Sequence, residues 1–174
     1  MKCLTRSECS EWLKRNNLVE SPYQKCRENL YVQFEAPGKP RRLTAFARRL
    51  MAILGPFSGA LILFEDWSPC ESDAMALIDA IRRGYDERRF LIDAPGHLFE
   101  STEADQVIGL CYLTLLFGWT AYLYLPQPVS ATVLFWEGDL MDVWVQDGDM
   151  RDGVREMVKE FELRVTFPKS DAAT

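Results

Sequence analysis

Histidine is almost absent from this chain of 174 residues, which contains a single one, His97. Cysteine is more frequent, but its five copies are odd in number and include no C-x-x-C pair, so they match neither a zinc finger nor a small disulfide scaffold. They are Cys3, Cys9, Cys26, Cys70 and Cys111. We therefore expect no metal site and no cofactor. The first residues become charged at once, unlike a secretory signal, which predicts reduced thiols and a cytoplasmic location.

Positive charge is also scarce, with 20 Lys and Arg against 26 Asp and Glu and a formal net charge of −6. Such a surface repels phosphate polyanions, so we expect no nucleic-acid partner, whereas a basic protein partner would be attracted. The one basic stripe is expected to be the solvated face of an amphipathic helix. It consists of Arg41, Arg42, Arg48 and Arg49.

Charge of either sign is missing between Val107 and Trp136. A membrane-spanning helix needs about 20 apolar residues, so the length of this run raises that question. Gly118 interrupts the run, however, and the next segment, TAYLYL, alternates like a strand before a PQP turn. The flanks are acidic rather than basic. We expect a buried helix followed by two core strands, and no membrane span.

The length suits one domain spanning residues 1–174, and 48% of the residues are hydrophobic, which is enough to build a core. Apolar patterns predict five strands, at residues 30–36, 59–67, 120–125, 131–137 and 140–146. Helical spacing predicts a helix capped by Thr5 and Glu8, and helices at 43–54, 72–85, 102–117 and around 154–161. LRVTF is read as an edge strand, and RFLID as a short strand or an extended lead into a turn. The predicted fold is α+β, with one mixed or mostly antiparallel sheet of about five strands and helices packed on it.

Eight apolar residues of the predicted strands and of the helix at 102–117 are expected to be buried together as the core. They are Leu61, Leu63, Phe64, Leu110, Leu113, Leu116, Val133 and Phe135. The helix at 72–85 is expected to turn Met75, Ile78, Ile81 and Tyr85 inward.

The only histidine lies in the stretch RRFLIDAPGHLFESTEAD, among acidic residues that include Asp93 and Glu100. A histidine near carboxylates can act as a general base or a metal ligand. These carboxylates are neighbours in sequence, however, and need not converge in space. Pro-Gly is also good turn chemistry. We expect His97 to be structural, at a turn leading into a helix capped by Thr102, with one ring nitrogen holding a backbone carbonyl or a carboxylate. Gly96 would supply a backbone conformation that other residues resist.

A second candidate site is FEDWSPCESDA, where Glu65 and Asp66 end a strand and Cys70 stands near the start of a helix. A helix amino terminus stabilises a thiolate, and the order of strand, cysteine and helix has a passing likeness to thioredoxin. One cysteine of that motif is missing, and the adjoining acidic residues oppose thiolate formation. We expect an ordinary helix start. The alternative is a small enzyme or thiol protein in which Glu65, Asp66 and Cys70 face Asp93 and His97.

A third candidate is the acidic segment EGDLMDVWVQDGDMRDG. Its carboxylates are Glu137, Asp139, Asp142, Asp147, Asp149 and Asp152. A calcium loop starting at Asp147 would need an oxygen ligand at its fifth position, where Arg151 stands, so that pattern fails. We expect a solvated acidic edge with a helix cap, which could serve as a docking surface for a basic partner.

Several motifs together resemble a family of uncharacterised bacterial proteins over most of the chain. The motifs are LTRSECSEWL, a strand ending in EDWSP, APGHLF, and LFGWTAYLYL before a late acidic and aromatic segment. The resemblance implies no activity, ligand or catalytic residue. It does suggest that Pro95, Gly96, His97 and Phe99 act as a unit.

The sequence contains no complete catalytic motif, and it is acidic and rich in Trp and Tyr, the residue types that anchor interfaces. We therefore expect a non-enzymatic cytoplasmic protein that works through protein contacts, as an immunity-like or regulatory partner. Exposed aromatic surface on the last strands would also permit a homodimer.

Overall fold

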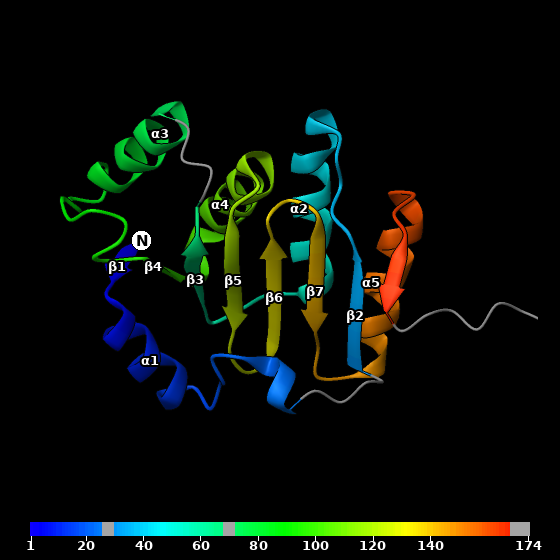
Figure 1. Ribbon diagram of the computed structural model, residues 1–174. Coiled ribbons are helices and arrows are strands. Elements are labelled where there is room, and N and C mark those ends of the chain that lie inside the picture. The colour runs from blue at the N-terminus through cyan, green and yellow to red at the C-terminus, as the bar shows by residue number, and fades with distance from the viewer. Residues whose placement is uncertain (26–29, 68–71, 168–174) are drawn as a thin grey trace, which may run out of the picture.

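The computed structural model describes residues 1–25, 30–67 and 72–167. Eight strands form one sheet, in the order β1-β4-β3-β5-β6-β7-β2-β8 (Figure 1). The strands are β1 (Lys2–Leu4), β2 (Tyr31–Glu35), β3 (Gly59–Asp66), β4 (Gly96–Glu100), β5 (Thr120–Leu125), β6 (Ala131–Trp136), β7 (Leu140–Trp144) and β8 (Val165–Phe167). Each pair of neighbouring strands is antiparallel. The α+β class and the antiparallel sheet are therefore as predicted.

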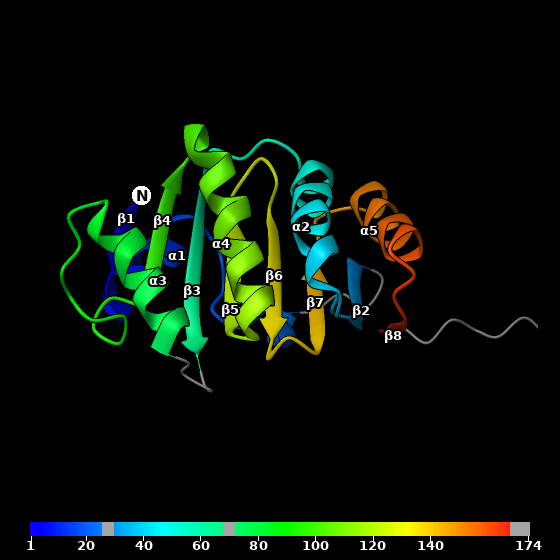
Figure 2. The ribbon, with the colours of Figure 1, turned by 90° about the horizontal axis from the view of Figure 1, so that it is seen from above.

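The α-helices cover the two faces of the sheet unequally. They are α1 (Arg6–Arg15), α2 (Pro40–Leu54), α3 (Ser72–Arg83), α4 (Ala104–Phe117) and α5 (Gly148–Glu160). Figure 2 shows α2, α3, α4 and α5 side by side on one face, and α1 lies on the other. The short 3-10 helix η1 (Pro22–Lys25) crosses that second face near the ends of β5 and β6 (Figure 1).

Strand β3 contributes to both hydrophobic cores because its side chains alternate between the two faces. Ile62 and Phe64 join the larger core under the four helices. Leu61 and Leu63 point the other way and pack with residues of α1 and with Tyr124. Seven of the eight residues predicted to be buried together are thus divided between two cores, and the eighth, Leu116, is 36% exposed.

The prediction of about five strands was too low. Strand β1 has only three residues, too few to show an alternating pattern. Strand β4 begins at Gly96, immediately after a proline, so its sequence resembles a turn. The short strand considered for RFLID is wrong, because residues 91–93 form a turn.

The helices follow the predicted segments with local differences. Helix α1 has the expected capping box, in which Thr5 and Glu8 satisfy each other's backbone N–H groups. Thr102 does not cap α4, because residues 101–103 form a separate 3-10 turn, which Glu100 and Glu103 cap. Tyr85 lies beyond the end of α3 and is exposed, not turned inward.

The long uncharged run forms helix α4 and strands β5 and β6, as predicted. The helix ends at Gly118, which adopts the left-handed conformation with φ 63°. Within the ranges that the structure describes, no helix is long and apolar enough to cross a membrane.

Candidate functional site

His97 lies inside the sheet, not at a turn. It is the second residue of β4, between β1 and β3, where it pairs with Cys3 on one side and Ile62 on the other. Its side chain is 0% exposed and its ring meets Phe64 edge-on, with 5.3 Å between the ring centroids. The predicted turn position of His97 is therefore wrong. His97 is buried because it and Phe99 occupy alternate positions of a strand, and both point into the core.

The ring nitrogens of His97 contact a backbone carbonyl and a buried cation. Nδ1 lies 3.2 Å from the Pro95 carbonyl oxygen, and Nε2 lies 3.4 Å from Nη1 of Arg82. A guanidinium can only donate, so this arrangement assigns the acceptor role to Nε2 and the proton to Nδ1. Burial, and next the charge of Arg82, lower the pKa of His97 to about 3. The imidazole is therefore neutral at physiological pH.

Arg82, in the last turn of α3, is fully buried and donates hydrogen bonds to three backbone carbonyls. Its Nη1 donates to the Ala94 carbonyl at 2.9 Å, and its Nη2 donates to the carbonyls of Arg89 and Phe90 at 2.9 and 3.2 Å. No carboxylate pairs with Arg82 in the part of the chain that the structure describes. Backbone carbonyl dipoles therefore stabilise this buried charge.

The three carbonyls that Arg82 holds belong to the segment between α3 and β4, residues 84–95, which we call the anchored loop. It is the green loop at the left of Figure 1. A second arginine fixes it to the edge of the sheet, because Nη2 of Arg89 donates to the Cys3 carbonyl of β1 at 3.1 Å. Glu87 pairs with Arg89, and hydrogen bonds from Arg89 lower the pKa of Glu87 to about 2. The loop is thus tied to both α3 and β1.

The anchored loop displays two large apolar side chains to solvent. Phe90 is 73% exposed and Ile92 is 70% exposed, more than any other large hydrophobic residue described. Leu91 between them is buried, so its side chain packs the loop against the rest of the protein. Isolated exposed apolar residues are common, but two such side chains on a fixed backbone are suited to a binding surface.

The residues of the enzyme alternative do not converge. Glu65 forms an ion pair with Arg6 of α1 at 2.8 Å, on the face of the sheet opposite the four helices. His97 lies on the other face, against Phe64. Asp66 and Asp93 are both exposed, and the ring nitrogens of His97 contact Pro95 and Arg82 instead. Cys70 lies outside the described residues, as does Cys26.

The acidic segment is divided between the two ends of β7. Glu137 and Asp139 lie in the hairpin turn before the strand, where Glu137 and Gly138 have φ of 50° and 73°. At the other end, Asp147 caps α5 by accepting from the Met150 N–H. The expected helix cap is present. The carboxylates do not form one continuous acidic edge.

Asp142 in the middle of β7 is completely buried, although the sequence predicted a solvated position. Its carboxylate accepts hydrogen bonds from the hydroxyls of Tyr23 and Tyr31 and from the Gln33 amide. Strand alternation does place Asp142 on the face away from the four helices, as the sequence implies. Burial comes from Tyr23 of η1, which is 119 positions away in sequence and gives no local signal.

Three cysteines lie in the described part of the chain, and all three are buried and form no disulfide. They are Cys3, Cys9 and Cys111. Burial raises the pKa of both Cys9 and Cys111 to about 12, so neither is a thiolate at neutral pH. Across residues 1–25, 30–67 and 72–167 there is no group of three or more metal-ligating side chains placed to hold an ion.

Comparison with known proteins found no relative: no family model, no curated protein and no solved structure matches this chain. The likeness to bacterial proteins with an APGHLF segment therefore stays a prediction. The structure does place His97 and Phe99 of that segment in one buried strand, with Pro95 bonded to His97.

Proposed function

We propose that this protein is a non-enzymatic, cytoplasmic binding protein, immunity-like or regulatory, which contacts a protein partner through the anchored loop. The observation that supports the proposal is the exposure of Phe90 and Ile92 on a loop whose backbone is fixed by Arg82. A loop that is already ordered loses little conformational entropy on binding, so more of the contact energy contributes to affinity.

The composition of the loop fits the usual arrangement of an interface, with apolar anchors inside a polar rim. Arg88 and Asp93, which flank the two apolar residues in sequence, are exposed. A partner would need an apolar cleft for Phe90 and Ile92 and a mixed polar surround. The net charge of −6 would favour encounter with a basic partner through long-range attraction.

The geometry gives the enzyme alternative no comparable support. A general base at neutral pH needs an accessible group with a suitable pKa. His97 is inaccessible, and its pKa of about 3 makes it a poor proton acceptor. Glu65 is held by Arg6 on the opposite face of the sheet.

The test is a comparison of two variants of the full chain as bait in a cell lysate. The first variant combines Phe90→Asp with Ile92→Asp, and the control is Trp136→Asp, which changes an exposed aromatic residue of β6. A captured protein is identified by mass spectrometry, purified and titrated by calorimetry.

Burying each apolar side chain contributes about 1.5–3 kcal/mol, so we expect the double variant to bind at least about 100-fold more weakly than wild type. The Trp136→Asp control should bind normally. Equal binding by wild type and the double variant would contradict the proposal, as would a wild-type chain that captures no protein.

A further inference from the structure

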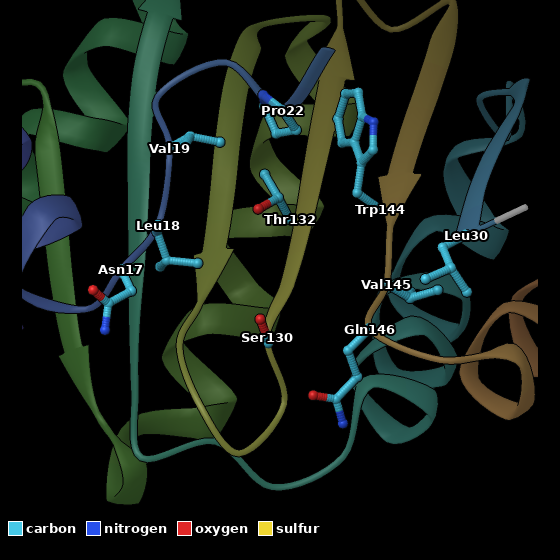
Figure 3. A pocket seen from close by; sticks show the side chains of 10 residues that line it. All are labelled: Asn17, Leu18, Val19, Pro22, Leu30, Ser130, Thr132, Trp144, Val145 and Gln146. Carbon is cyan, nitrogen blue, oxygen red and sulfur yellow. The ribbon is translucent and has the colours of Figure 1, made fainter. Parts of the chain in front are cut away.

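A pocket of about 320 Å³ opens on the face of the sheet that the four helices leave uncovered. One wall is the segment 17–22, which leads into η1, and the other is the end of β7 (Figure 3). Strand β6 forms the floor, with Thr132 and Ser130 pointing into the hollow between the walls (Figure 3). The volume is within the range of small-molecule sites. Figure 1 shows this region far from the anchored loop.

The chemistry of the pocket changes from one end to the other. Val19, Pro22 and Trp144 line one end of the pocket, with the Thr132 side chain among them, and the other end presents the amides of Asn17 and Gln146 and the hydroxyl of Ser130 (Figure 3). None of the ten lining residues is charged. A charged ligand would lose its hydration here without meeting an opposite charge, which is unfavourable. An amide side chain both donates and accepts, so it pairs well with another amide.

Two features of the lining are relevant to binding. Ser130 has a left-handed backbone, with φ 46°, a conformation that costs a non-glycine residue about 1 kcal/mol or more and is frequent at ligand sites. The indole Nε1 of Trp144 is buried and has no hydrogen-bond acceptor among the described residues. In Figure 3 this nitrogen lies on the side of the ring nearer Leu30, another lining residue.

We propose that this pocket binds a small uncharged ligand of amide type, with a carbonyl and an N–H on a compact apolar frame. The amides of Asn17 and Gln146 and the hydroxyl of Ser130 hold its polar edge, and the Thr132 hydroxyl donates or accepts one further hydrogen bond from the floor of the pocket. Pro22, Val19 and the Trp144 ring pack against its apolar side. The site is independent of partner binding by the anchored loop.

The experiment is an NMR titration of the ¹⁵N-labelled full chain with two neutral probes and one charged analogue. Uracil represents a cyclic amide and N-acetylglycinamide a peptide amide, while orotate is uracil with an added carboxylate. We expect at least one neutral probe to shift the Trp144 indole and the Ser130 and Gln146 amide signals saturably at millimolar concentration. The probe that does so distinguishes a nucleobase-like ligand from a peptide-like one. Orotate should bind at least tenfold more weakly than uracil.

Variants of the lining test the assignment. Thr132→Val removes one hydroxyl at nearly constant volume, and Gln146→Glu introduces a charge at the polar end. Each should weaken binding about 3- to 10-fold, which corresponds to the loss of one neutral hydrogen bond. Gln106→Glu, on α4 across the sheet, is the matched control and should have no effect; dispersed spectra confirm that each variant is folded. Absence of saturable shifts with both neutral probes, equal binding of orotate, or variants that bind like wild type would overturn the proposal.

Discussion

Nη1 of Arg82 lies 3.4 Å from Nε2 of His97 in the interior of the protein, and no carboxylate pairs with the guanidinium in the described chain. The two residues come from α3 and β4, on either side of the anchored loop. The neutral ring accepts from the cation on one side and donates to the Pro95 carbonyl on the other. The pair therefore holds both ends of the loop in place.

Arg82→Lys is expected to release the anchored loop. A lysine keeps the charge but cannot donate to three separate carbonyls in the fork geometry of a guanidinium. The Ala94 and Arg89 carbonyls would lose their donors, whereas the Phe90 carbonyl also accepts from the Asp93 and Ala94 N–H groups. A carbonyl left without a donor costs about 1–3 kcal/mol, so the free energy of unfolding should decrease by about 2–4 kcal/mol. Urea denaturation measures the change, and hydrogen exchange should accelerate in residues 84–95. Arg83→Lys, at the exposed neighbouring position, should change stability by less than about 0.5 kcal/mol. An unchanged exchange rate in the loop would disprove the anchoring role.

His97→Gln is expected to keep the fold and any partner binding, since glutamine also offers one donor and one acceptor. The pH dependence of stability should change, however. In the unfolded chain His97 titrates near the ordinary histidine pKa of 6.5, whereas in the folded protein its pKa is about 3. Between these values the unfolded state binds the extra proton, so wild-type stability decreases as pH falls, by up to about 1.4 kcal/mol per pH unit. Urea denaturation from pH 7 to pH 4 should show a smaller decrease for His97→Gln.

The same variant tests the metal alternative. If His97 bound a metal, Zn²⁺ or Ni²⁺ would raise the melting temperature of wild type but not of His97→Gln. The burial of the ring against Phe64 predicts no such difference.

Gly96 is expected to be intolerant of any side chain, for a reason that differs from the one the sequence suggested. It is not among the residues with positive φ, so backbone strain is not involved. A Cβ at this position would instead lie 2.2 Å from Sγ of Cys9 and 3.2 Å from Cβ of Leu4. Gly96→Ala should therefore decrease the free energy of unfolding by about 1–3 kcal/mol, and Gly96→Val by more.

A double-mutant cycle isolates that contact. Cys9→Ala removes the sulfur, so part of the cost of Gly96→Ala should be recovered in the Cys9→Ala background. Gly38→Ala is the control, because a Cβ there meets nothing within 4 Å. Simple additivity of the two changes would mean that the crowding lies elsewhere.

Asp142→Asn is expected to destabilise the protein by about 1–3 kcal/mol. The carboxylate accepts from three donors, and an asparagine would turn an N–H group toward at least one of them. Tyr23→Phe should cost less by itself, and its effect should shrink in the Asp142→Asn background because the two side chains are bonded. Asp139→Asn in the exposed hairpin turn should have almost no effect on chemical denaturation. A neutral result for Asp142→Asn would show that its three donors do not require a charged acceptor.

The sequence predicted best what depends on neighbouring residues. The Thr5 and Glu8 capping box and the helix cap of the acidic segment, which Asp147 forms, each involve residues within a few positions of one another. The end of α4 at Gly118 could also be predicted from the sequence, because glycine adopts the left-handed conformation without a steric penalty.

What the sequence could not predict depends on distant partners. An arginine in an amphipathic helix is normally solvated, and nothing near Arg82 indicates that a loop will wrap around it. The burial of Asp142 requires Tyr23, and the placement of His97 requires β1 and β3 on either side. The high content of Trp and Tyr also does not indicate an interface by itself, since Trp119, Tyr124 and Trp144 are buried inside the protein.

The hydrogen bond from Arg89 to the Cys3 carbonyl also affects how copies of this protein can associate. β1 is the last strand on its side of the sheet, and an uncovered last strand can recruit a strand from another molecule. Here an incoming strand would first have to displace a side chain that is itself held by Glu87. The Arg89 side chain therefore opposes the addition of a strand from another molecule at β1, and a symmetric pair of copies is not expected to form through this edge of the sheet.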